Sequence, residues 1–305
     1  MKNLARNTPD VITKERVATQ CVCCDGLQLT KSQAILMPFV AHRVFGWEPA
    51  VIDDSWGLKT IKNGTAYTLA NSLFCTHCGF LFLDMRFDDN EMTALYNGYR
   101  DQQYTALREK YEPGYSKRND FLTSGANYIS EVEKFLSPLI SLPVRILDWG
   151  GDTGKNTPFK NNNTVFHIFD ISNQKPIADA EIVDKKTMAE TDYDLIVCSH
   201  VLEHIPYPAE LLLAIKNVMH ENTLLYIELP YEEMMRTAAI SENLSVKKRH
   251  WHEHINFYSE KSLIQLLSRC GFQVIHLNHL KISDHNNQAT YFFQIACSLN
   301  ITVGK

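Results

Sequence analysis

The sequence lacks any apolar run of the length that a membrane span requires, which is about 20 residues. Its first twenty residues also lack an apolar segment followed by a cleavage site, so we expect a cytoplasmic protein. Basic residues are not in excess, because 30 Lys and Arg stand against 35 Asp and Glu, for a net charge of −5. Nucleic-acid affinity depends on many basic contacts, so we expect no nucleic-acid partner.

Internal repeats and low-complexity tracts are absent as well. Apolar residues make up 45% and charged residues 21% of the sequence, which is typical of a folded globular protein. The length of 305 residues exceeds one average domain and predicts a separate amino-terminal unit. Three of the eight cysteines, Cys198, Cys270 and Cys297, lie singly among apolar residues and are predicted to pack in the core.

The other five cysteines form two clusters, Cys21-Val-Cys-Cys-Asp-Gly26 and Cys75-Thr-His-Cys-Gly-Phe80. In a reducing compartment such clusters indicate a metal site rather than disulfides, and two Cys-x-x-Cys pairs can close a tetrahedral zinc site. We predict a structural zinc ion that holds a small domain together. Its predicted ligands are Cys21, Cys24, Cys75 and Cys78. Whether Cys23 replaces Cys24 stays open, and reduced, unliganded thiols are the alternative.

An apolar strand runs into an acidic, glycine-rich turn in the segment Val144-Arg-Ile-Leu-Asp-Trp-Gly-Gly-Asp-Thr-Gly154. This pattern predicts a nucleotide-sized pocket at the carboxyl end of the strand. Gly150 and Gly151 let a ligand approach the backbone, and Gly154 lets a following helix pack closely. The full three-glycine pattern that cradles a pyrophosphate is missing, which disfavours a nicotinamide dehydrogenase, and the two acids favour a cationic ligand with an amino group and a sulfonium. A turn that binds nothing is the alternative.

Further strands follow at suitable spacing. Thr164–Phe169 ends at Asp170, about twenty residues downstream, where a carboxylate can accept both hydroxyls of a ribose. Glu181–Val183 ends at an acid, and Asp194–Cys198 runs into the segment Ser199-His-Val-Leu-Glu-His-Ile-Pro206. A helix at 208–219, a strand at 223–229, a helix at 262–270 and two late strands, 272–277 and 291–298, complete the prediction.

The order of these parts from about residue 140 to 300 resembles the class I S-adenosylmethionine-dependent methyltransferases, and Asp194–His204 is similar to their segment after strand four. The resemblance implies an α/β, Rossmann-like fold with a mostly parallel seven-stranded sheet and helices on both faces. It also implies that the turn wraps the methionine part of the cofactor, that Asp170 takes the ribose, and that Asp184 with Lys185 borders the adenine. The implied cofactor-binding residues are Asp148, Gly150, Gly151, Asp152, Gly154, Asp170, Ile171, Asp184, Lys185, Ser199 and His200. Asp152 replaces the family's usual glycine, a departure that repels the methionine carboxylate unless a water or a cation mediates.

The densest set of titratable groups is Lys247-Lys-Arg-His-Trp-His-Glu-His-Ile-Asn-Phe-Tyr-Ser259. Methyl transfer is an in-line displacement that needs alignment and then proton removal, and a histidine has a suitable pKa for a base. The run from Trp251 resembles the Tyr-His-Glu-His...Phe-Ser segment of bacterial nucleotide-sugar C-methyltransferases, which also carry an amino-terminal cysteine-rich zinc domain. That resemblance implies His254 as the base and Glu253 as its partner, and we include His252 among the catalytic candidates. A structural loop is the alternative.

Two further segments are open to two interpretations. Lys247, Lys248 and Arg249 form a solvated loop or bind the diphosphate of a nucleotide-sugar. A tyrosine-rich stretch from Tyr96 to Tyr115, which includes Arg100, lines a pocket for a polar ligand or packs as a helical face.

Together these features predict a zinc-binding domain at 1–87, a helical linker or lid at 88–140 and an S-adenosylmethionine-binding domain at 141–305. The predicted activity is methyl transfer to a hydroxyl or carbon of an activated, nucleotide-linked sugar in polysaccharide or secondary-metabolite biosynthesis. The alternatives are a non-catalytic adaptor that binds S-adenosylmethionine and zinc, or a methyltransferase of another small molecule. The accepting atom and the oligomeric state stay open.

Overall fold

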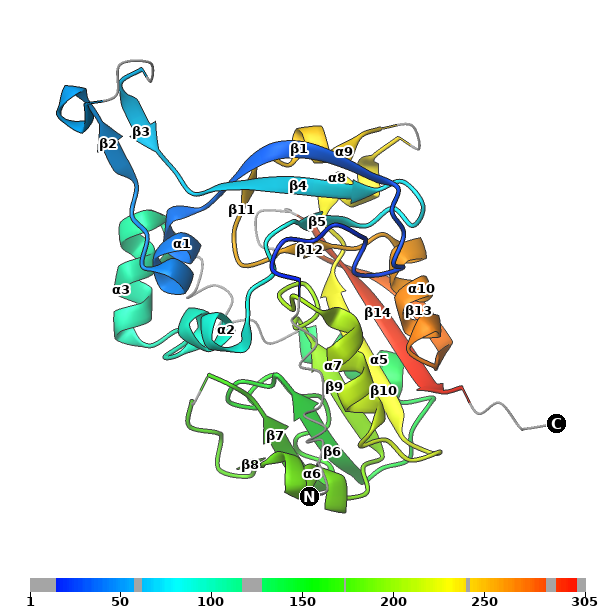
Figure 1. The fold of residues 1–305 in the computed structure, drawn as a ribbon. Coiled ribbons are helices and arrows are strands. Elements are labelled where there is room, and N and C mark those ends of the chain that lie inside the picture. The colour runs from blue at the N-terminus through cyan, green and yellow to red at the C-terminus, as the bar shows by residue number, and fades with distance from the viewer. Residues whose placement is uncertain are drawn as a thin grey trace, which may run out of the picture.

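The computed structural model describes residues 15–57, 62–116, 128–172, 174–239, 242–283 and 289–300. Within these ranges the chain forms a seven-stranded sheet, a five-stranded sheet and a two-stranded hairpin (Figure 1). The segment 284–287, between the two predicted late strands, lies outside the described residues. No helix within the described ranges is long and apolar enough to cross a membrane.

The larger sheet confirms the α/β class and the predicted seven strands. Its order is β13-β14-β10-β9-β6-β7-β8. Strands β6 to β10 are parallel, and β14 is antiparallel to both β10 and β13. The strands are β6 (Val144–Trp149), β7 (Asn163–Phe169), β8 (Glu181–Ile182), β9 (Leu195–Ser199), β10 (Leu224–Pro230), β13 (Phe272–Ser283) and β14 (Ala289–Leu299). The chain leaves β6 toward one edge and returns to β9 on its other side, which creates a topological switch point.

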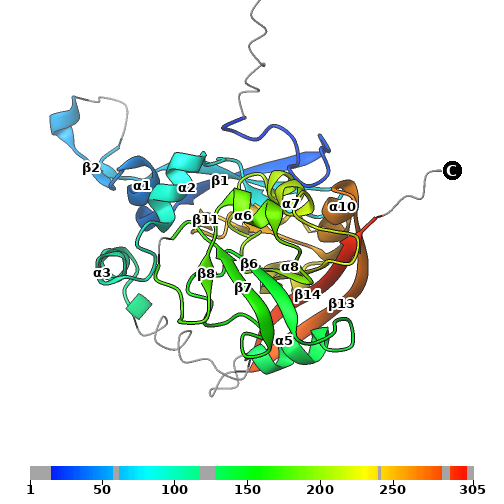
Figure 2. The ribbon, with the colours of Figure 1, turned by 90° about the horizontal axis from the view of Figure 1, so that it is seen from below.

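Alternating side chains of the central strands enter two separate cores, because successive residues of a strand face opposite sides. In β9, Leu195 and Val197 pack in the core with α5 (Tyr128–Leu136). Ile196 and Cys198 pack in the core with α7 (Pro208–Lys216) and α10 (Glu260–Arg269). Figure 2 shows α5 on one side of the sheet and α7 with α10 on the other, so helices cover both faces as predicted. The short α6 (Lys185–Glu190) follows β8.

One predicted helix is absent. The segment between β6 and β7 forms turns, and no helix packs behind Gly154. Pro158 has no backbone N–H and restricts the residue before it, and the three asparagines at 161–163 favour turns over helix. Gly154 is required for a different contact, because a Cβ there would lie 2.7 Å from Ile168 and 2.8 Å from Phe166 on β7.

The smaller sheet joins distant parts of the chain in the order β11-β1-β4-β5-β12. Its strands are β1 (Leu29–Leu36), β4 (Leu69–Cys75), β5 (Leu81–Leu83), β11 (His250–Trp251) and β12 (Asn256–Phe257). The two strands at its edges therefore come from the histidine-rich segment, and Figure 1 shows them, in orange, beside the blue and cyan strands. The loop 252–255 is thereby held at both ends by the amino-terminal sheet. The predicted division at residues 87 and 140 stays a prediction.

Helices α1 (Pro38–Phe45), α2 (Asp89–Tyr96) and α3 (Gln102–Tyr111) lie beside the smaller sheet, and the hairpin β2 (Ala50–Ile52) with β3 (Gly64–Ala66) projects from it (Figure 1). The short helices η1 (Asp54–Trp56), α8 (Glu233–Thr237) and α9 (Leu244–Lys247) complete the described elements. Helix α2 begins with a capping box in which the side chains of Asp88 and Glu91 each accept a backbone N–H of the other residue.

Arg86 connects the smaller sheet to the loops of the larger one. Its side chain is 1% exposed and donates to the carbonyl of Pro206 at 3.0 Å, to Asn256 Oδ1 at 3.0 Å and to the carbonyl of Leu83 at 2.5 Å. Asn256 in turn donates to the carbonyls of Leu202 and Ile205. Burial lowers the pKa of Arg86 to about 10, so the guanidinium stays charged at neutral pH.

Replacing Arg86 by methionine is expected to lower the free energy of unfolding by about 2–4 kcal/mol, because several buried acceptors lose their donor. Chemical denaturation followed by circular dichroism measures this change. Arg16→Met is the matched control, since Arg16 is half exposed and forms ion pairs with Asp88 and Glu91 that are worth less than about 1 kcal/mol. Equal loss in both variants would contradict the structural role of Arg86.

Candidate active site

The turns after β6 and β9 meet at the carboxyl edge of the larger sheet. Gly150 has φ +82°, and a Cβ at this position would lie 2.5 Å from Val201 in the turn after β9. Any other residue at 150 would therefore push the two turns apart. This junction is the topological switch point between β6 and β9, where α/β sheets bind their ligands.

The acidic turn is built around Asp148, which is 5% exposed at the end of β6. Burial raises its pKa to about 7, while a hydrogen bond from the Thr157 hydroxyl favours the charged form. Gly151 is needed beside this carboxylate, because a Cβ would lie 2.5 Å from Cγ of Asp148. Asp152 has φ +51°, the left-handed conformation that glycine adopts most easily. The turn therefore keeps the backbone conformation of a glycine at 152 and adds a carboxylate.

Asp170 lies at the end of β7, opposite this turn. Its carboxylate accepts the backbone N–H of Asp152 at 2.9 Å and that of Ser172 at 2.6 Å. The next residue, Ile171, is 45% exposed, as suits a side chain that packs on a ligand. This arrangement is compatible with an adenosine cofactor whose hydroxyls bind Asp170. The Asp170 carboxylate provides acceptor oxygens, Ile171 provides an exposed apolar side chain, and Gly150 and Gly151 leave space where a Cβ would clash.

Asp184 and Lys185 have different surroundings. Both are exposed, and Asp184 caps α6 by accepting the backbone N–H and the hydroxyl of Thr187, each at 2.8 Å. Hydrogen bonds from Thr187 lower the pKa of Asp184. The carboxylate is thus occupied by its own helix, and its predicted place beside the adenine stays a prediction.

His200, in the turn after β9, lies between the buried carboxylates of Glu203 and Glu228. It has φ +56°, its Nε2 lies 3.2 Å from Glu228 Oε1, and its Nδ1 lies 3.3 Å from Glu203 Oε1. Burial raises the pKa of Glu228 to about 8, and the Ser199 hydroxyl donates to the same carboxylate at 3.3 Å. The structure shows that Ser199 and His200 link β9 to β10, and their predicted contact with the cofactor stays a prediction.

His254 lies in a cluster of histidines and carboxylates. Its Nδ1 is 3.3 Å from Glu232 Oε1, and its ring packs edge-on against His204 with centroids 4.6 Å apart. Ligand atoms of His254, His204 and Glu203 lie within 4.8 Å of one another. Burial alone would lower the pKa of His254, but the hydrogen bond to Glu232 and the charges of Glu203 and Glu253 outweigh it and raise the pKa.

The pKa of His204 is shifted in the opposite direction. Burial and the charge of His254 lower its pKa to about 4, so it is neutral at neutral pH. Its Nδ1 lies 2.7 Å from the Tyr96 hydroxyl and 3.0 Å from the carbonyl oxygen of Glu253. The pKa values of the two neighbouring histidines are therefore shifted in opposite directions. Such a separation of pKa values helps to assign a proton-transfer role to one of the two groups.

Glu253 has a different partner from the one we expected. It forms an ion pair with Arg108 of α3 at 2.6 Å, and the carboxylate beside His254 is Glu232. Burial would raise the pKa of Glu253, but the charge of Arg108 lowers it to about 2. His252 points to Glu112, with Nδ1 3.1 Å from Oε1. His252 and Glu253 therefore lie at the same Arg108–Glu112 pair, whereas His254 faces Glu232.

The remaining predicted groups of this segment lie outside the cluster. Trp251 is fully buried and donates from its indole N–H to the Ser72 hydroxyl at 2.9 Å, so it belongs to the core of the smaller sheet. Lys248 covers the rings of Trp251 and Phe257, and Lys247 pairs with Glu242. The basic run therefore does not converge on one anion.

Part of the tyrosine-rich stretch packs as a helical face, and its role in lining a ligand pocket stays a prediction. Tyr104 and Tyr115 are buried, at 2% and 6% exposure, and pack with Phe39 and Arg108. Tyr96 instead reaches His204 of the candidate site.

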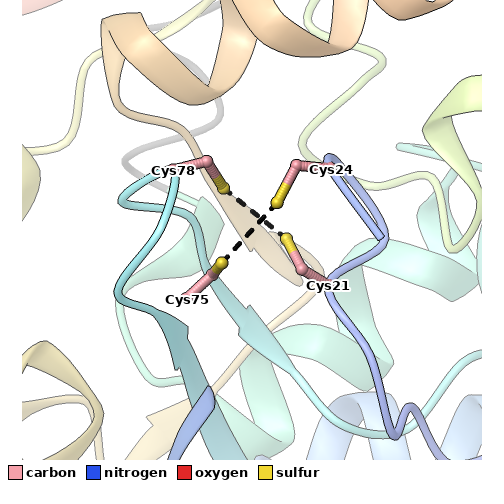
Figure 3. Close-up of side chains that lie close together, drawn as sticks. All are labelled: Cys21, Cys24, Cys75 and Cys78. Atoms are coloured by element: carbon pink, nitrogen blue, oxygen red, sulfur yellow. Dashed lines mark hydrogen bonds between the residues drawn. The ribbon is translucent and has the colours of Figure 1, made fainter. Parts of the chain in front are cut away.

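The four predicted metal ligands converge. The sulfurs of Cys21, Cys24, Cys75 and Cys78 lie within 4.8 Å of one another. Figure 3 shows the four side chains pointing toward a common centre. The sulfurs of Cys21 and Cys78 are 3.6 Å apart, and those of Cys24 and Cys75 are 3.7 Å apart. Cys23 is buried and does not belong to the group.

The seven-stranded sheet and the acidic turn at its switch point define an α/β enzyme domain of the class I methyltransferase type. The family model described as a methyltransferase domain matches residues 121–277, just over half of the 305 residues. The chain therefore belongs to this methyltransferase family, and it is an S-adenosylmethionine-dependent methyltransferase. No curated protein matches the sequence.

Several solved structures are similar at low identity. An S-adenosylmethionine-dependent methyltransferase of Methanosarcina mazei is 12% identical, with TM-score 0.37 over 54% of this chain and 96% of its own. The 1,6-didemethyltoxoflavin-N1-methyltransferase of Burkholderia thailandensis is 16% identical, with TM-score 0.44 over 65% and 89%. The glycopeptide N-methyltransferase MtfA is 12% identical, with TM-score 0.41 over 57% and 94%. Similarity at this level says nothing of the acceptor.

Proposed function

We propose that the protein transfers a methyl group to a hydroxyl or carbon of an activated, nucleotide-linked sugar in the cytoplasm, with His254 as the general base. The observation that carries this proposal is the position of His254 between the carboxylates of Glu232 and Glu203, beside the turns at the carboxyl edge of the sheet. The sugar as acceptor rests on the sequence resemblance of Trp251–Ser259 alone.

The proposed roles follow from the contacts. His254 takes the proton of the accepting atom, and Glu232 and Glu203 stabilise the imidazolium that results. Arg108 holds Glu253, and with it the loop that presents His254, while Glu112 orients His252. The acidic turn and Asp170 bind the cofactor, which supplies the methyl group from its sulfonium when bound. Alignment of the acceptor with that group can provide about 7–11 kcal/mol of the rate enhancement.

We also propose that the four cysteines bind a structural zinc ion. Sulfurs that lie about 2.3 Å from a central ion at tetrahedral angles are about 3.8 Å apart. The observed separations of 3.6 and 3.7 Å are close to this spacing. Four thiolates leave no coordination position open, so the ion would stabilise the fold and take no part in methyl transfer.

The test is mass spectrometry of nucleotide-sugars, including keto-sugars, incubated with the protein and S-adenosylmethionine. We expect one product heavier by one methylene, and a labelled methyl on oxygen or on carbon identifies the accepting atom. Tight cofactor binding without a product across the panel would overturn the nucleotide-sugar acceptor and would favour another small molecule or a non-catalytic adaptor.

A further inference from the structure

Glu203, His204 and His254, here called the Glu203 cluster, bring three side chains of the metal-binding kind together. One ligand atom of each residue lies within 4.8 Å of those of the other two. Glu203 and His204 follow β9, and His254 lies on the loop between β11 and β12, so two loops distant in the sequence form the cluster. Two imidazoles with one carboxylate are a ligand set for divalent transition-metal ions, including zinc.

Glu203 contributes a buried carboxylate to the cluster. The residue is 2% exposed, and its Oε1 lies 3.3 Å from His200 Nδ1. Its Oε2 is buried and has no hydrogen-bond partner in the part of the chain that the structure describes. Leaving a buried acceptor unpaired costs free energy, more so when the group is charged, and the cost is recovered when a ligand binds to it. Oε2 of Glu203 is therefore an independent indication that a cation belongs at this position.

Hydrogen bonds outside the cluster orient both imidazoles. Nδ1 of His254 lies 3.3 Å from Glu232 Oε1, and Nδ1 of His204 lies 3.0 Å from the carbonyl oxygen of Glu253 and 2.7 Å from the Tyr96 hydroxyl. A carboxylate and a carbonyl oxygen can only accept, so Nδ1 carries the proton and Nε2 of each neutral ring keeps a lone pair. Metal-binding histidines are held in this way, with an acceptor behind the ring that fixes the tautomer.

The spacing of the cluster allows an ion to be bound with small movements. Ligand atoms about 2.1 Å from a tetrahedral zinc ion are about 3.4 Å apart. Nε2 of His204 lies 3.9 Å from Oε1 of Glu203, and the ligand atoms of all three residues lie within 4.8 Å of one another. Rotations of the side chains therefore close the site. The side chain of His254 is 35% exposed, which gives an ion access from solvent.

A neighbouring group of ligand-type residues lacks these properties. Glu112, His252 and Glu253 also have ligand atoms within 4.8 Å of one another. Arg108 already neutralises both carboxylates, at 3.1 Å from Glu112 and 2.6 Å from Glu253. A metal ion would have to displace this guanidinium, so the Glu203 cluster is the better site for a cation.

We propose that Glu203, His204 and His254 bind one divalent transition-metal ion, and that the bound ion prevents His254 from accepting a proton. The ion occupies the lone pair of Nε2 that proton transfer requires, so the protein with this site filled is inactive in methyl transfer. Metal binding does not depend on the acceptor, whereas the inhibition rests on the proposed role of His254 as the base. The site is separate from the cysteine cluster and, with three protein ligands, is not closed.

The test is a titration of the dialysed, full-length protein with Co²⁺, followed by calorimetry and by visible absorption. We expect one added Co²⁺ per chain, with the weak d–d bands of nitrogen and oxygen ligands and without the near-ultraviolet charge-transfer band of thiolates. Glu203→Gln and His254→Asn should each weaken binding more than about 100-fold, since loss of an outer-shell partner alone costs about 10–100-fold. Circular dichroism checks that both variants are folded.

His252→Asn is the matched control for binding, because it removes an imidazole from the same loop, two residues from His254. This variant should bind Co²⁺ with the affinity of the parent. Loss of binding in His252→Asn alone would place the ion beside Glu112 and Glu253. That result, unchanged affinity in Glu203→Gln and His254→Asn, or a parent that binds Co²⁺ only through thiolates or not at all, would overturn the site.

Methyl-transfer assays test the inhibition separately from the binding. We expect the rate to fall as Co²⁺ fills the site, with half of the activity lost at the calorimetric Kd and regained after dialysis. Full activity at saturating Co²⁺ would overturn the inhibitory role. A parent protein that methylates no nucleotide-sugar would instead count against the proposed acceptor, because the binding titrations contain no acceptor and keep their outcome.

Discussion

Replacing His254 by asparagine is expected to lower kcat for methyl transfer by about 10²–10⁴-fold, the usual contribution of a general base. Affinity for S-adenosylhomocysteine should not change, because the cofactor turn and Asp170 lie on other loops of the sheet. Asparagine keeps a polar group opposite Glu232 but cannot accept the proton. Steady-state assays with the methylated acceptor as readout give kcat, and calorimetry gives cofactor affinity. A variant that keeps at least a third of the parent's kcat would exclude His254 as the base.

The pH profile of the parent protein provides a second readout of His254. The base is active when neutral, so kcat/KM should rise with pH through the raised pKa of His254 and then level off. The groups that face His254 are Glu232, Glu203, Glu253 and the neutral His204. In Glu232→Gln the carboxylate that raises this pKa is lost, and the rise should move to lower pH. An unchanged profile would mean that another group is the base.

Much of the catalytic domain could be predicted from local patterns. Buried strands such as Val144–Trp149 and Leu195–Ser199 appear as short apolar runs, and the acids and glycines that follow them mark the carboxyl edge. The cysteine pairs were informative because zinc ligation requires a fixed spacing within each pair. The structure places Cys24 rather than Cys23 in the cluster, which the sequence left open.

Contacts between distant segments could not be predicted in the same way. No local pattern shows that His250–Trp251 pairs with β1, or that Arg108 reaches Glu253, since both contacts depend on the packing of the smaller sheet. Glu232 lies outside the histidine-rich run and was therefore missed. The assumed helix after Gly154 came from the glycine-rich turn, and Pro158 was the local signal against it.

The cysteine cluster should also be necessary for the fold of the amino-terminal sheet. Both Cys-x-x-Cys turns touch α10, because Ser259 donates to the carbonyl of Cys78 at 2.9 Å and Arg269 donates to that of Val22 at 3.2 Å. Structural zinc sites contribute about 10–16 kcal/mol of binding free energy in small peptides. Loss of the proposed zinc ion should therefore disorder the smaller sheet and release the loop that carries His254 from β11 and β12.

We accordingly expect Cys24→Ala to lose stoichiometric zinc, to unfold at a lower temperature and to lose methyl transfer. Cys23→Ala is the matched control, because its thiol is buried one residue away but lies outside the cluster. That variant should retain one zinc per chain, with only the stability loss of a small cavity. Metal analysis and thermal unfolding of both proteins measure the difference. Full zinc content in Cys24→Ala, or its loss only in Cys23→Ala, would show that the ion is bound by a different set of thiolates.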